Sequence, residues 1–433
     1  MTVSKSALIA ALAVTLLGTD VFAADFAGQK LNKRSFQRKA VDDFNFENAN
    51  ADSSSFQNAY GTSLNFQNAS LVGTRFNNAQ LTDADFRGAN LTTAEFKSAF
   101  LSNIDFREAN LSGANLKNAT FTNGEFSDGN YKKAILSGSK FTEGADFSGS
   151  DFTEAKLEGL DLTAANFKNT NLTKADLKGL SLPGGNFSGS IFESTRLDYS
   201  NLIGADLSDL NFKNVSFKKA GLNRVDLSGS TFTDVNLTSA DMSLTDLDGI
   251  DFSKSNITKA KFSGSNIEDM SFVGLTITGT NWDKAKISDV LFEGAKGEKA
   301  SFYDSEISSS NFSKGEFRKA IFDGSFIEKS QFVGTDLTKA NFSNASVDKV
   351  IFDKAKLDGV KFYGAKFVKV GFNGASLKGV KMNADTRMWQ VDFSGADLTG
   401  AKLKKVQFQN CIYDRKTKFP SGFNPAKAGF VRR

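Results

Sequence analysis

A large apolar residue occurs at every fifth position from Phe26 to Phe408, and the positions between are mostly small or polar. An α-helix would spread residues of this spacing around its circumference, and a β-strand would place alternate ones on opposite faces. The chain is therefore predicted to bend in the same way every five residues. The repeat shifts by one residue twice, within residues 142–146 and within residues 383–387, and a local bulge at each place would absorb the insertion.

A ten-residue period lies on top of the five-residue repeat. Phenylalanine recurs at every tenth position from Phe302 to Phe352, and mostly aliphatic residues stand between. With three repeats per coil the two kinds would alternate up every face, whereas four repeats place like above like. The sequence thus predicts an all-β, square coil of twenty residues, with phenylalanine stacks on two opposed walls and about 19 coils in parallel pairing. Alanine is frequent two residues before the apolar position, as at Ala300, and would share the narrow interior.

Three apolar positions are occupied by small residues instead. Gly297 lacks a side chain within the long middle register, so we expect a local gap or kink there. Ala51 and Gly61 predict a less regular start of the coil, covered by Phe44 and Tyr60.

One pattern recurs along the chain: a small residue, Asp or Asn, Leu or Phe, a small polar residue and a variable one. It is seen in Ala84-Asp85-Phe86-Arg87-Gly88, Ala175-Asp176-Leu177-Lys178-Gly179 and Ala396-Asp397-Leu398-Thr399-Gly400. These repeats closely resemble those of the pentapeptide-repeat family. The resemblance covers about nine-tenths of the chain and implies a right-handed quadrilateral β-helix whose outer surface is set by the variable positions. Tyr413-Asp414 and residues 417–425 are similar to the closing segment of many such proteins. We therefore expect a solenoid over residues 24–408 and a C-terminal closing segment over residues 409–433.

Residues 1–23 have the features of a signal peptide. Lys5 supplies a positive start, residues 7–18 are apolar, and Val21-Phe22-Ala23 places small residues where signal peptidase requires them. Cleavage after Ala23 would make the protein exported, periplasmic or extracellular, with no transmembrane segment in the mature chain. The alternative is an N-terminal anchor, but the apolar run is shorter than the roughly 20 residues of a spanning helix.

The sequence offers little of the chemistry that catalysis needs. It contains no histidine, which excludes Ser-His and Cys-His nucleophiles and removes the commonest metal ligand and general base. No phosphate-binding loop or dinucleotide fold is recognisable. Aspartates before the apolar position are predicted to hydrogen-bond the backbone at recurring bends, and not to act as catalytic pairs or calcium ligands. These aspartates include Asp85, Asp105, Asp206, Asp226 and Asp246. We expect no enzyme activity and no catalytic, cofactor-binding or metal-binding residues, and Cys411 is interpreted as a packed thiol, with intermolecular pairing as the alternative.

Charge is distributed unevenly along the chain. Residues 24–250 carry a net charge of −6 and residues 251–433 one of +10. Two trios of lysines are spaced by twenty and should align on successive coils; they are Lys299, Lys319 and Lys339, and Lys329, Lys349 and Lys369. Such rows would suit an anionic partner, namely a phosphorylated glycan, acidic lipid headgroups or an acidic protein, although an exposed lysine row is also typical of a solvated face. Nucleic-acid binding is not expected, because the sequence predicts no exposed aromatic residues between the lysines of the basic half.

The resemblance also implies a function for comparison. The best-characterised members of the family resemble DNA, have a strongly acidic surface and bind DNA gyrase. This chain departs from them in its net charge of +4 and in its predicted signal peptide. The sequence therefore favours a non-enzymatic, exported scaffold whose flat walls engage a protein or cell-envelope partner. The alternatives are a secreted effector acting on a host or competitor protein, and a gyrase-binding DNA mimic. The sequence indicates no oligomeric state.

Overall fold

The computed structural model describes residues 23–142 and 144–433, and these divide into two compact units, one up to Ala220 and one from Gly221 to Arg433. All the regular elements in the described part are short β-strands, and all their pairings are parallel. The predicted signal peptide, residues 1–23, lies outside the described residues apart from Ala23, so it stays a prediction.

In the first unit, one wall is a five-stranded sheet in sequential order, and β6 pairs with β7 on another wall. Its strands are β1 (Tyr60–Thr62), β2 (Gln80–Thr82), β3 (Phe100–Ser102), β4 (Thr120–Thr122), β5 (Lys140–Thr142), β6 (Phe192–Glu193) and β7 (Asn211–Lys213).

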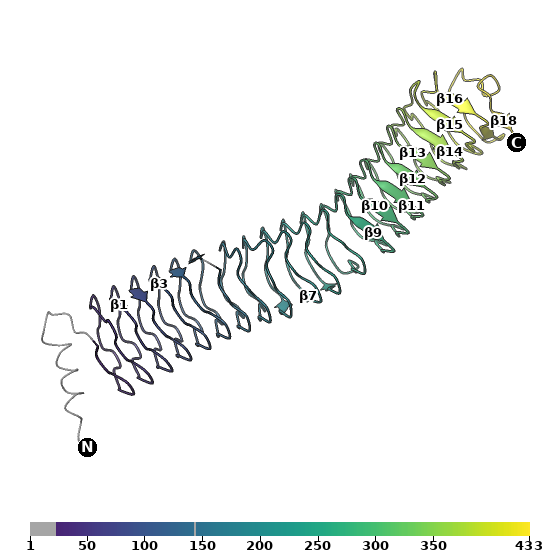
Figure 1. The fold of residues 1–433 in the computed structure, drawn as a ribbon. Helices are drawn as coiled ribbons and strands as arrows, with labels where there is room; N and C mark the ends of the chain where they lie inside the picture. Colours follow the sequence, from purple (N-terminus) through teal and green to yellow (C-terminus); the bar gives the residue numbers. More distant parts are fainter. Residues whose placement is uncertain (1–22, 143) are drawn as a thin grey trace. The chain divides into compact units, whose positions relative to one another are not determined.

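In the second unit, eight strands in sequential order, β9 to β16, form one wall, and β17 pairs with β18 at the end (Figure 1). Its strands are β8 (Thr231–Thr233), β9 (Asn266–Glu268), β10 (Lys286–Ser288), β11 (Glu306–Ser308), β12 (Phe326–Glu328), β13 (Ser346–Asp348), β14 (Lys366–Val368), β15 (Arg387–Trp389), β16 (Gln407–Gln409), β17 (Ile412–Tyr413) and β18 (Val431–Arg432).

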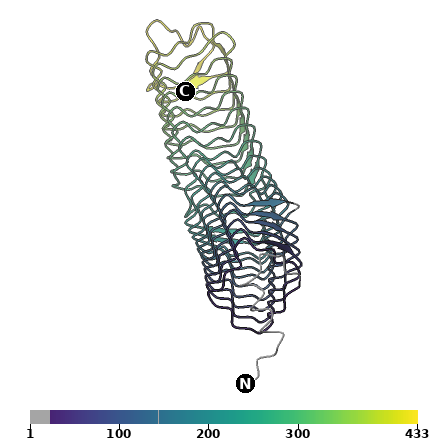
Figure 2. The same ribbon diagram turned by 90° about the vertical axis from the view of Figure 1, so that its left-hand side faces the viewer.

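Successive coils pair in a register of twenty residues. Tyr60 pairs with Gln80 in the first unit, and Lys286 pairs with Glu306 in the second. Isolated bridges repeat the same spacing on the remaining walls, and in each unit the coils lie one above the next (Figure 2). The prediction of a four-sided β-solenoid of about 19 coils is confirmed.

The two one-residue insertions lie where the sequence predicts them. Glu125 pairs with Asp146, and Lys366 pairs with Arg387, so that the register is twenty-one residues across each insertion. At the second insertion the buried Thr386 hydroxyl donates to the carbonyl of Phe362 at 2.8 Å. The bulge is therefore tied to the preceding coil, and pairing continues beyond it.

Two opposed walls of the second unit carry the predicted aromatic stacks. We name the four walls A to D in chain order, and wall A holds β9 to β16. Wall B has Phe292, Phe312 and Phe332 inside, and wall D, which follows wall C, has Phe302, Phe322 and Phe342 inside. Phe312 stacks on Phe332 with ring centroids 4.5 Å apart. Across the interior, Phe312 meets Phe322 edge to face at 6.1 Å. Such pairs are stabilising beyond the area they bury, and the buried Ala320 leaves room for them.

The gap predicted at Gly297 is absent. A Cβ atom on Gly297 would lie 2.4 Å from the Phe317 ring, which is closer than real contacts allow. A Cβ atom on Gly315 would lie 2.5 Å from the same ring. The phenylalanine of the following coil therefore fills the space of the missing side chain. The backbone bridges of Lys296 to the coils on either side are kept.

The prediction of an irregular start is also wrong, and only one of the two residues predicted to cover it is buried. Pairing is regular from Asp25, which bridges to Asn45, onwards. Phe44 is buried against Phe26, with ring centroids 5.7 Å apart, and so belongs to the core. Tyr60 is instead 49% exposed.

The C-terminal end of the second unit is closed by aromatic residues. Phe430 is buried and packs against Phe408, with ring centroids 4.9 Å apart. The Cys411 thiol is buried and donates to the carbonyl of Met388 at 3.2 Å, and burial raises the pKa of this thiol. A packed thiol at Cys411 is confirmed, whereas the boundary at residue 408 stays a prediction.

Phe352→Ala should destabilise the second unit by roughly 3 to 5 kcal/mol, because it leaves a cavity between two stacked neighbours. The Phe352 ring is fully buried and lies 4.9 Å from that of Phe332 and 5.2 Å from that of Phe372. Lys349→Ala is the control, because it removes an exposed ion pair with Asp348 that contributes little. Urea unfolding and hydrogen exchange compare the two variants, and equal destabilisation would contradict the assignment of inside and outside.

Candidate binding surfaces

The aspartates before the apolar positions act as backbone acceptors, as predicted. Asp85 Oδ1 accepts a hydrogen bond from the amide of Arg87 at 3.0 Å. The same bond, to the amide two residues ahead, is made by Asp105, Asp206, Asp226 and Asp246. Each carboxylate thus stabilises the bend that follows it. In the described part of the chain no group of His, Cys, Asp or Glu side chains could hold a metal ion, and no helix is long and apolar enough to cross a membrane.

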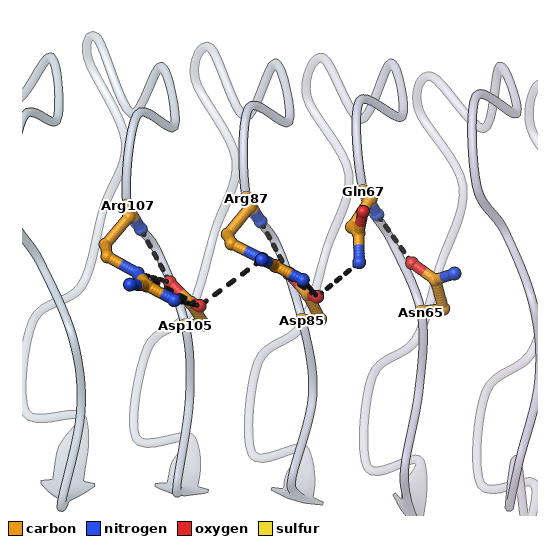
Figure 3. Close-up of polar contacts among 6 residues, drawn as sticks. All are labelled: Asn65, Gln67, Asp85, Arg87, Asp105 and Arg107. Atoms are coloured by element: carbon orange, nitrogen blue, oxygen red, sulfur yellow. Dashed lines mark hydrogen bonds and ion pairs between the residues drawn. The ribbon is translucent and has the colours of Figure 1, made fainter.

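A continuous polar ladder crosses successive coils of the first unit, as Figure 3 shows. Gln67 donates to Asp85 at 2.6 Å. The guanidinium of Arg87 pairs with Asp85 at 2.6 Å and lies 3.4 Å from Asp105 of the next coil. Arg107 repeats the bond within its own coil, at 2.6 Å from Asp105. Charges on this wall therefore neutralise one another, which leaves little net charge for a partner.

The two predicted lysine trios lie at turns and not on the flat walls. Lys319 and Lys349, for example, have φ angles of 59° and 53°, in the left-handed region. Several of these side chains are already paired: Lys319 lies 3.3 Å from Glu298, and Lys349 lies 3.3 Å from Asp348. The trios do align on successive coils, but nearby carboxylates offset part of their charge.

A different set of cations forms a second basic region of the second unit. We call it the basic surface; it comprises Lys361, Lys381, Lys402, Lys404 and Lys405 on and beside wall D, and Lys366 and Arg387 on wall A. None of the described carboxylates forms an ion pair with these side chains. Other lysines of the same part of the chain do form ion pairs: Lys349 with Asp348, and Lys378 and Lys418 with Asp397. Asp385 lies within the same segment, and its carboxylate accepts from Asn383 at 3.2 Å. The surface therefore has a large uncompensated positive charge.

The lysine row of the basic surface was not predicted from the sequence. Lys361 bridges to Lys381 and Lys381 bridges to Lys402, so the three lie on successive coils. Their spacing is twenty and then twenty-one residues, because the second insertion falls between the last two. A search at a constant spacing of twenty misses the row, whereas correcting the spacing for the insertion would have found it.

The prediction that the basic half has no exposed aromatic residues is wrong. Its exposed rings include Tyr303, Phe326, Tyr363 and Trp389, which are between 37% and 45% exposed. Two of them, Tyr363 and Trp389, lie within the coils of the basic surface. Charge and exposed rings therefore do occur together there.

Two family models match the sequence. The model described as a pentapeptide repeat region matches residues 205–282 and 305–382, and that described as pentapeptide repeats in eight copies matches residues 62–97, 99–142, 134–169, 170–209 and 384–412. Together they span roughly three quarters of the chain. No curated protein matches the sequence significantly.

Solved structures with a similar fold include three pentapeptide repeat proteins. HetL, a protein involved in heterocyst differentiation regulation in the cyanobacterium Nostoc, is 20% identical, with 56% of this chain and 89% of HetL covered and a TM-score of 0.28. A protein of the Arabidopsis thaliana thylakoid lumen is 28% identical over 22% of this chain and 68% of its own, with a TM-score of 0.22. QnrB1, a plasmid-mediated fluoroquinolone resistance protein, is 18% identical over 51% of this chain and 93% of its own, with a TM-score of 0.27. These low scores carry no functional argument.

Acid should weaken the polar ladder of the first unit. Burial alone would raise the pKa of Asp85, but its hydrogen bonds with Arg87 and Gln67 outweigh this and lower the pKa below its ordinary value. A lowered carboxylate pKa contributes stability that is complete above the ordinary value and is lost as the pH falls below about 4. Wild type should therefore lose more stability than Asp85→Asn between neutral pH and pH 3, as measured by urea unfolding.

The matched control for this titration is Asp246→Asn. Asp246 accepts the amide of Asp248 at 3.2 Å but stands outside the arginine ladder. Between neutral pH and pH 3 this variant should lose more stability than Asp85→Asn, because it keeps the arginine ladder. An Asp85→Asn profile that parallels wild type would contradict a stabilising role for the ladder.

Proposed function

Because the chain belongs to the pentapeptide-repeat family, we propose that it is a non-enzymatic, exported scaffold whose flat walls bind a protein or a component of the cell envelope. The single observation that carries this proposal is that the core and the walls use different side chains. The inward side chains stack in the core, whereas the outward ones repeat on every coil and can vary without disturbing the fold.

The wall chemistry supports a binding role. In the first unit, opposite charges are paired along the ladder of Asp85, Arg87 and Asp105. In the second unit, the basic surface is left without carboxylate partners. A surface with unpaired charge attracts a partner of opposite sign and raises its rate of association.

Export is supported by residues 1–23, whose charge and apolar run are typical of a cleaved signal. A DNA-mimicking role would require an acidic surface, and the basic surface of the second unit argues against it. The secreted effector remains the second candidate within the same class of binding proteins.

Fractionation of the native cells tests the proposal. The protein should be recovered from the envelope or the medium with Ala24 as its first residue, because signal peptidase removes residues 1–23. A variant lacking residues 2–23 is the control and should stay in the cytosol. In vivo crosslinking of the exported protein should then give a discrete adduct with an envelope component. Recovery of an uncleaved cytosolic protein would overturn the exported role.

A further inference from the structure

We infer that the basic surface binds a linear acidic polysaccharide, which lies along the edge between walls D and A with about one anionic group per coil. This inference rests on the proposed function and names the partner class of one of its walls. Four features support this partner: the spacing of the lysines, the unpaired Nε atom of Arg387, the exposed rings and the shape of the surface.

The lysine row has the repeat of an extended polymer. Lys361, Lys381 and Lys402 are bridge residues on consecutive coils, which places their backbones about 4.8 Å apart, the spacing of paired strands. Like charges directly opposite each other on neighbouring strands are destabilising. In the first unit the bridged residues Asp85 and Asp105 also carry like charges, but each carboxylate is paired with an arginine of its own coil. A row of uncompensated cations is therefore a departure that an external polyanion would relieve.

Arg387 supplies a second, independent indication on the neighbouring wall. Its Nε atom is buried and has no hydrogen-bond partner within the described structure. A buried unpaired donor is costly, and more so when it belongs to a charged group. The planar guanidinium is suited to two parallel hydrogen bonds with a carboxylate. Arg387 pairs through its backbone with Lys366 of the preceding coil, so both cations flank the same edge.

Exposed rings next to the cations suit a sugar. Tyr363 is 38% exposed and Trp389 is 37% exposed. Tyr363 follows the inward Phe362 on wall D, and Trp389 ends β15 on wall A. The negative face of an aromatic ring attracts the weakly positive C–H groups of a pyranose, as it attracts the edge of another ring. Carboxylates and sugar rings of one polymer would thus meet lysines and aromatic rings of one surface.

The shape of the surface favours a polysaccharide over other polyanions. The basic side chains cover two walls that meet at an edge, whereas a flat bilayer would contact one wall at a time. Duplex DNA carries a charge for about every 1.7 Å of its axis, which is much denser than the row of Lys361, Lys381 and Lys402, where each coil contributes one lysine. A polymer with one carboxylate per sugar is better matched to one cation per coil.

The test uses the mature full-length protein and an oligogalacturonate of defined length, which carries one carboxylate per sugar. Calorimetry at low salt should detect binding to the oligogalacturonate and none to its methyl ester, which has the same backbone without the charge. The triple variant Lys361→Gln, Lys381→Gln, Lys402→Gln should bind at least about tenfold more weakly, since each lysine near an anionic surface contributes measurably. Arg387→Gln should weaken binding as well.

The matched control is the triple variant Lys299→Gln, Lys319→Gln, Lys339→Gln, which removes the same charge at the same spacing from the turns of wall C. It should bind the oligogalacturonate nearly as tightly as wild type. Circular dichroism establishes that both variants are folded.

Several outcomes would overturn the inference. Equal weakening by the two triple variants would mean that net charge alone attracts the oligogalacturonate. Tighter binding of oligodeoxythymidylate, or of vesicles containing phosphatidylglycerol, through Lys361, Lys381 and Lys402 would assign the surface to nucleic acid or lipid. Absence of oligogalacturonate binding would also reject the inference, while an envelope adduct in the crosslinking experiment would leave the proposed function standing.

Discussion

The fold depends on one interaction, the parallel backbone pairing of each coil with the next in a register of twenty residues. The amide of Phe66, for example, donates to the carbonyl of Asp85 at 2.7 Å, and the amide of Asp85 donates to the carbonyl of Leu64 at 2.8 Å. Because every wall repeats these bonds, a residue of one coil lies directly above its counterpart in the previous one. Aromatic stacks inside and charged rows outside both follow from this alignment.

The same register decides which chemistry each wall can present. A cation repeated at the register makes a row, and its effect depends on which residues stand next to it. Lys319 at a turn reaches a carboxylate of a neighbouring turn, and Lys261 on the flat wall pairs with Asp241 of the preceding coil at 3.2 Å. Lys381 stands in the same wall row as Lys261 but forms no ion pair among the described residues. The residues on the adjacent coils therefore decide whether a lysine row is neutralised or keeps its charge.

The sequence predicted the coil because its signal is repeated on every turn, and errors are confined to single positions. The gap at Gly297 was wrong because the neighbouring Phe317 fills it, which depends on packing between coils and not on the residue itself. Phe44 and Tyr60 were both expected to cover the start of the coil, yet only Phe44 is buried there. The row through Lys361, Lys381 and Lys402 was missed because the inserted residue changes its spacing. The predicted signal peptide lies outside the described residues apart from Ala23, and it stays a prediction, as does the partner.

The most direct measurement compares two deletions in the second unit by thermal unfolding followed with circular dichroism. Removal of residues 311–330 takes out one whole coil, so the remaining coils keep their register. Removal of residues 311–328 takes out nearly the same length but displaces every later side chain from its wall. We predict a cooperative transition close to that of wild type for the first deletion and its loss for the second. Similar transitions in both would contradict the twenty-residue register on which the walls depend.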